Sequence, residues 1–268
     1  MTTNNLRFSV LFFVRKIKKM LNNPGTNINN DSKNEALLRN RSLSLVKRIA
    51  LFIVGLGGLF VLSLLFGLIY SFVDLPKDEK SAQLTLVTYA ALILALFSII
   101  FLDIPRLIGY LKEWKGYAMG IAIGIIVIVF DIAYSNIVNL FYQSSVNQNE
   151  ESVRGVIDIY PIASILILGI VGPICEELTY RVGLFGAIKR YTTIGAYIVT
   201  PLVFGAIHFG FTNPNIYDEL VSLPMYVFSG LAFSFAYDKF GFQCSAVAHM
   251  TNNLWAVVLR VIAKAIGQ

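Results

Sequence analysis

The sequence contains few charged residues. Of its 268 residues, 14% are Asp, Glu, Lys or Arg, whereas 56% are hydrophobic. About a quarter of the residues of a typical soluble domain are charged. This shortage excludes an ordinary soluble protein and predicts a membrane protein that crosses the bilayer several times.

Cysteine is also scarce. Cys175 and Cys244 both lie in apolar segments, and their spacing matches no metal-binding or redox motif. We therefore interpret both cysteines as small apolar residues that fill space between helices, and we expect no disulfide or thiol chemistry.

The positive charge is concentrated near the N-terminus. Ten of the 22 Lys and Arg residues precede residue 49, where only Asp31 and Glu35 oppose them. This pattern is typical of a cytoplasmic segment beside anionic lipid headgroups, and it argues against nucleic acid as the partner. We expect a basic cytoplasmic segment over 1–47, with an interfacial helix over 1–21 and a flexible linker over 22–46.

Long apolar runs occupy the rest of the chain. Each is near or above the roughly 20 residues that cross a bilayer, except the short run 221–237. Because a span must satisfy its own backbone hydrogen bonds, the sequence predicts an all-α polytopic membrane protein with about seven transmembrane helices. We expect three of them within 48–142 and the others within 143–268. The runs are 49–73, 82–102, 117–142, 159–190, 193–211, 221–237 and 242–262.

The loops between these runs alternate in charge. Loops 74–81 and 143–158 are mainly acidic, whereas loop 103–116 and the pair Lys189 and Arg190 are basic. Cytoplasmic loops carry an excess of Lys and Arg, so the pattern predicts a cytoplasmic N-terminus and a C-terminus on the other side.

Several ionisable residues interrupt the apolar runs. The uncharged stretch "YPIASILILGIVGPIC" leads directly into Glu176, Glu177 and Arg181, and both histidines, His208 and His249, also lie within apolar segments. Such groups are costly in a bilayer and usually face a bundle interior or a wet cavity, where they mark a functional site. The alternative, that each only bonds a neighbouring helix, does not readily explain five such groups on three helices.

Helical spacing relates these residues to one another. Glu177 precedes Arg181 by four positions, so the two side chains can form an ion pair along one helix. Glu176 then points about 100° away from Glu177 and is left for another role. His249 and Asn253 are also four residues apart and share a helix face.

Three short motifs occur in a fixed order. "EELTYR", "FGAIH" and "HMTNN" match E-E-x-x-x-R, F-x-x-x-H and H-x-x-x-N. Over residues 159–262 the sequence resembles the CPBP family of intramembrane proteases, which includes CAAX prenyl endopeptidases and bacteriocin-processing and bacteriocin-immunity proteins. The resemblance implies an enzyme of a bacterial plasma membrane that hydrolyses a peptide bond of a membrane-associated peptide or protein through a glutamate-activated water.

The resemblance also implies roles for the polar residues. Glu176 and His208 would hold and deprotonate the water, and His249 and Asn253 would donate hydrogen bonds to the oxyanion. Glu177 and Arg181 would orient the site.

A zinc ion is a second possibility for this set. Glu176, His208 and His249 are residue types that bind zinc. The sequence lacks the H-E-x-x-H spacing of zinc proteases, which favours a metal-free site but leaves zinc open.

Two other classes of function remain as alternatives. A non-catalytic membrane scaffold or bacteriocin self-immunity protein could have the same fold, although every motif side chain is present here. A transporter with a polar site at mid-membrane is less favoured, because no duplicated pair of spans broken by Gly or Pro is visible.

Overall fold

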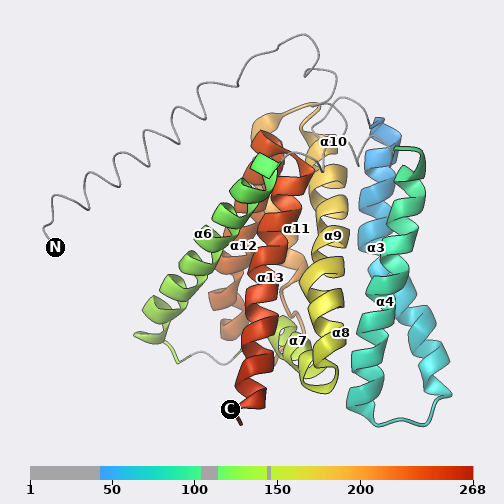
Figure 1. Ribbon diagram of the computed structural model, residues 1–268, viewed down its shortest axis with the longest axis vertical. Coiled ribbons are helices and arrows are strands. Elements are labelled where there is room, and N and C mark those ends of the chain that lie inside the picture. Colours follow the sequence, from blue (N-terminus) through green and yellow to red (C-terminus); the bar gives the residue numbers. More distant parts are fainter. Residues whose placement is uncertain (1–42, 104–113, 144–145, 268) are drawn as a thin grey trace, which may run out of the picture. The chain divides into compact units, whose positions relative to one another are not determined.

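The computed structural model describes residues 43–103, 114–143 and 146–267 (Figure 1). The predicted interfacial helix over 1–21 and nearly all of the predicted linker lie outside these residues. Every regular element in the described part of the chain is helical, and this confirms the predicted all-helical class. The helices are α3 (Leu45–Ser71), α4 (Lys77–Ile100), η1 (Phe101–Asp103), α6 (Trp114–Asn139), α7 (Gln148–Ile159), α8 (Pro161–Leu166), η2 (Ile167–Val171), α9 (Gly172–Glu176), η3 (Glu177–Phe185), α10 (Gly186–Ile188), α11 (Thr193–Ile207), α12 (Ile216–Phe240) and α13 (Phe242–Ala265).

Six helical runs in the described residues are long and apolar enough to cross a membrane. They are α3, α4 with η1, α6, the run from α8 to α10, α12 and α13. The predicted span that is not among these six is 193–211, which corresponds to α11, a helix of only 15 residues. At 1.5 Å per residue α11 is about 22 Å long, shorter than the roughly 30 Å hydrocarbon core. The helix α11 is therefore too short to cross the hydrocarbon core by itself.

The polar segment before the fourth span differs from the expected loop. Residues Gln148–Ile159 form the amphipathic helix α7, whose N-cap Asn147 accepts a hydrogen bond from the backbone N–H of Glu150 at 2.8 Å. At its other end Asp158 pairs with Arg260 of α13 at 2.6 Å. The hydrogen bond from Arg260 lowers the pKa of Asp158. The cap thus stabilises the start of α7. The bridge to Arg260 holds its other end against α13.

The run from Pro161 to Ile188 contains two π-helical stretches, η2 and η3. Pro173 lies between them and has no backbone N–H to donate. Short π-helical stretches inside longer helices are frequent at functional sites. The stretch η3 begins at Glu177, so both motif carboxylates lie where the helix changes its hydrogen-bonding pattern.

Close helix contacts hold this run in place. Gly183 of η3 leaves so little room that an added Cβ would lie 2.9 Å from the backbone nitrogen of Phe52 in α3. From the same helix, the fully buried Arg48 donates to the carbonyl oxygen of Val182 at 2.7 Å. The helix α3 therefore supports the segment that carries the motif carboxylates.

Glycines bring α6 and α13 together. Along α6, Gly116, Gly120 and Gly124 face α13, and a Cβ at Gly120 would lie 2.7 Å from the carbonyl oxygen of Cys244. Small residues at four-residue spacing permit such close approach of membrane helices. Toward its C-terminal end, α6 leans away from α13 (Figure 1).

The predicted orientation can be tested with single cysteines. The α3–α4 turn, α7 and the C-terminus lie at one end of the bundle, and α10 lies at the other (Figure 1). We expect Asp78→Cys and Glu151→Cys to react with an impermeant maleimide added outside intact cells. Tyr191→Cys should react only after permeabilisation. Both native cysteines are buried and give a low background. Protection of Asp78→Cys and Glu151→Cys in intact cells would reverse the orientation.

Candidate active site

The two motif glutamates lie at the junction of α9 and η3 and have different surroundings. Glu177 is fully buried and contacts three side chains. Its carboxylate lies 3.0 Å from Nη1 of Arg181 and 2.9 Å from Nδ1 of His249, and Oγ of Ser245 also donates to it. The predicted pair between Glu177 and Arg181 is present in the structure.

Arg181 is enclosed as completely as its partner. Its guanidinium lies 4.4 Å from the ring centre of Phe204 and 5.3 Å from that of Phe233. It also donates to the carbonyl oxygen of Gly230 at 3.3 Å. This set fixes both ends of the ion pair and connects η3 to α11 and α12.

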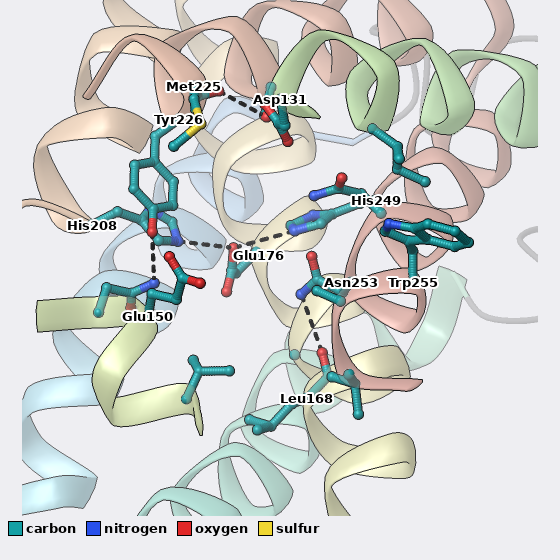
Figure 2. Close-up of a pocket in the computed structure, with 18 of the residues that line it drawn as sticks. Asp131, Glu150, Leu168, Glu176, His208, Met225, Tyr226, His249, Asn253 and Trp255 are labelled. Carbon is teal, nitrogen blue, oxygen red and sulfur yellow. Dashed lines mark hydrogen bonds and ion pairs between the residues drawn. The ribbon is translucent and has the colours of Figure 1, made fainter. Parts of the chain in front are cut away.

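Glu176 faces a cavity instead (Figure 2). Its Oε1 accepts a hydrogen bond from the hydroxyl of Tyr89 in α4 at 3.2 Å. Its Oε2 is buried and has no hydrogen-bond partner among the described residues. The nearest ring nitrogens are Nε2 of His249 at 3.8 Å and Nε2 of His208 at 4.0 Å. These gaps exceed a direct hydrogen bond and leave room for a small polar group beside all three atoms.

His208 is held by its own helix and by an aromatic neighbour. Its Nδ1 lies 2.7 Å from the carbonyl oxygen of Phe204. Because a carbonyl can only accept, Nδ1 carries a proton, and in the neutral ring Nε2 is then an acceptor. The ring stacks on Tyr226 with 4.6 Å between centres. Both contacts direct Nε2 toward Glu176.

His249 and Asn253 come from the same face of α13. The ring of His249 stacks on Phe233 at 4.5 Å, and its Nδ1 faces Glu177. The side-chain nitrogen of Asn253 donates to the carbonyl oxygen of Leu168 at 3.2 Å (Figure 2). An amide nitrogen has two hydrogens, so Asn253 retains a second donor.

A cavity of about 550 Å³ connects these groups. That volume is within the range of about 300–1,000 Å³ that is usual for ligand sites. Its walls come from α4, α6, α7, η2, α9, α11, α12 and α13. They include Glu176, His208, His249 and Asn253, whereas Glu177 and Arg181 lie behind the wall.

The structure brings all six predicted residues into one region and adds others. Tyr89 lies 87 positions before Glu176, on a helix that carries no motif, and nothing in the sequence indicated it. Ser245 was also missed, although it precedes His249 by four positions and could have been found from that spacing.

A zinc ion fits the described side chains poorly. No group of three His, Cys, Asp or Glu residues in the described ranges is placed to hold a metal ion. Tetrahedral zinc with bonds of about 2.0–2.1 Å requires ligand atoms about 3.3 Å apart. The separations of 3.8 and 4.0 Å from Glu176 to the two histidines are wider. The three side chains as they stand therefore do not match a tetrahedral zinc site.

Comparison with known proteins gives the family. Residues 158–255 match the family model described as type II CAAX prenyl endopeptidase Rce1-like. The match covers the segment that carries the three motifs, which is less than half of the chain. The family predicted from the three motifs is thereby confirmed, and the matched segment contains all six predicted site residues.

Two curated bacterial proteins are similar to this chain. One is named "Putative membrane peptidase YdiL", from Bacillus subtilis, and is 25% identical over 45% of this chain and 48% of its own length. The other is the UPF0177 protein YvdC from Lactococcus lactis, 26% identical over 57% of this chain and 57% of its own length. The chain thus spans about half the length of the curated relatives that it matches. No solved structure matches.

Proposed function

We propose that this protein is an intramembrane endopeptidase in which Glu176 activates a water molecule for attack on a peptide carbonyl. The observation that carries the proposal is the unpartnered Oε2 of Glu176 in the cavity, with two imidazole nitrogens about 4 Å away. A carboxylate in such a position can accept a proton from water and deliver it to the departing amine.

His208 has the geometry of a water-holding residue. Its Nδ1–H is bonded to the carbonyl of Phe204, so Nε2 can accept a hydrogen bond from the same water. Together, His208 and Glu176 would accept both hydrogens of the water and aim its lone pair at the substrate carbonyl.

His249 and Asn253 are proposed to stabilise the tetrahedral oxyanion. Asn253 offers its second amide hydrogen. His249 donates through Nε2 when both ring nitrogens carry protons, and the carboxylate of Glu177 then faces that charge at 2.9 Å. The carboxylates of Glu176 and Glu177 then balance the positive charges of His249 and Arg181. This balance limits the free-energy cost of the buried charges.

An isotope experiment tests the reaction class. The purified protein is reconstituted into lipid vesicles with membrane-anchored peptides in water enriched in oxygen-18. Direct hydrolysis places one heavy oxygen in the new carboxylate, which mass spectrometry of the fragments detects. Intact peptides, or fragments that form equally without the protein, would remove the proposal and favour a scaffold function.

A further inference from the structure

One carboxylate in the membrane-spanning part of the chain has no place in the mechanism above. Asp131 is the only charged residue between Lys115 and Glu150, near the middle of the apolar sequence "IIVIVFDIAYSN". It belongs to α6, outside the segment that matches the Rce1-like family. An ionisable group at such a position is costly and usually has a function.

Asp131 lines the same cavity as Glu176, His208 and His249 (Figure 2). Its Oδ1 is buried and has no hydrogen-bond partner within the described ranges, and none of the ion pairs formed there includes it.

Other buried carboxylates of the bundle are neutralised or hydrogen-bonded. Glu177 pairs with Arg181, and Asp238 pairs with Lys189. Glu219 accepts hydrogen bonds from the backbone N–H of Gln148 at 2.7 Å and of Gly210 at 2.8 Å. Asp131 and the Oε2 of Glu176 thus share two properties, since both lack a partner and both line the cavity.

Apart from the two histidines, the ionisable groups that face the cavity and carry charge are carboxylates. Three carboxylates line it, from Asp131, Glu150 and Glu176, whereas none of its lining residues is Lys or Arg. Glu150 already pairs with Arg154 at 2.6 Å, so its charge is compensated. With His249 protonated, Glu176 and Glu177 balance His249 and Arg181, so the uncompensated negative charge at the cavity wall is that of Asp131. This charge favours a substrate that brings positive charge.

We propose that Asp131 selects the substrate by pairing with a lysine or arginine side chain near the scissile bond. This inference rests on the proposed function and adds the chemical class of the substrate. Ile128 lies one turn before Asp131 on α6, and Ile132 follows Asp131 directly. Both isoleucines line the cavity. They offer apolar surface to the aliphatic stem of a basic side chain while its charged end reaches the carboxylate.

Binding to an inactive protein tests the inference independently of cleavage. The probes are three pools of dansylated nine-residue peptides with an apolar anchor, random except for one fixed residue: Lys, Gln or Glu. The Glu176→Gln protein in nanodiscs should bind the Lys pool about tenfold more tightly than the Gln pool, and the Glu pool most weakly. Adding Asp131→Asn should make the Lys and Gln pools bind equally. The matched control is Glu151→Gln, which removes an exposed carboxylate outside the cavity and should leave the preference unchanged.

Cleavage by the protein with Glu176 intact separates the two proposals. If the three pools bind equally to Glu176→Gln, or if Asp131→Asn retains the preference for Lys, the role of Asp131 is refuted even when cleavage occurs. If the preference for Lys depends on Asp131 but no pool is cleaved, the role of Asp131 in binding basic side chains is supported and the peptidase function is refuted. The supporting result is a preference for Lys in kcat/KM that Asp131→Asn abolishes.

Discussion

Glu176→Gln is expected to lower kcat by about 10²–10⁴-fold while the helical bundle remains folded. Glutamine keeps the size of the side chain and can still accept the hydrogen bond from Tyr89, but it cannot take a proton from water. Because Oε2 has no hydrogen-bond partner in the described residues, the substitution removes no direct hydrogen bond of that oxygen. The measurement is kcat in vesicles, together with thermal unfolding in detergent.

The matched control for this experiment is Glu177→Gln. That glutamate lies behind the cavity wall and compensates Arg181, so its loss should reduce thermal stability as well as activity. A Glu176→Gln protein that keeps full activity at normal abundance contradicts the proposed base and supports the scaffold alternative.

Arg181→Ala is expected to have the largest effect on folding. The guanidinium and the Glu177 carboxylate are fully buried 3.0 Å apart, and removal of one partner leaves a buried charge uncompensated. Breaking such a pair costs about 3–5 kcal/mol, enough to remove much of the folded protein from the membrane. Fluorescence-detected size-exclusion chromatography measures the folded fraction and its thermal midpoint.

A double substitution separates charge balance from chemistry. Glu177→Gln with Arg181→Met removes both charges and keeps similar volumes, so abundance should recover toward that of the unsubstituted protein. Activity should stay low, because His249 loses the carboxylate that orients its ring. If Arg181→Ala alone shows normal abundance and an unchanged thermal midpoint, the pair is not needed for folding.

Much of the fold could be predicted because hydropathy is a local property. A run of about 20 apolar residues leaves the backbone only one way to satisfy its hydrogen bonds in lipid, so α3, α4, α6 and α13 follow from composition and length. The seven-span description was less accurate at α11 and α12. Their ends depend on Glu219, which binds the turn between them through Gly210 and Asn213, and hydropathy carries no information on that contact.

The candidate site, like the fold, could be predicted only in part from the sequence. Helical periodicity alone placed Glu177 beside Arg181 and His249 on one face with Asn253, because side chains four positions apart are neighbours on any helix. Only the tertiary structure placed Tyr89 on Glu176 and enclosed Arg181 between Phe204 and Phe233. These contacts join separate helices, and the packing between helices decides which of their faces meet.

The sequence by itself determined that this protein is a helical membrane protein with a buried polar set and a segment that matches the Rce1-like family. Tertiary packing alone decided the surroundings of those groups: the free oxygen of Glu176, the π-helical η3 and the presence of Asp131 in the same cavity. The physical reason is that the properties read from the sequence and the contacts in the structure act over different distances along the chain. Hydrophobicity and helical spacing act within a few turns of one helix. Contacts between helices, such as those of Tyr89 with Glu176 and of Phe204 with Arg181, join residues tens of positions apart. Glycine contacts and helix ends fix how closely those helices approach.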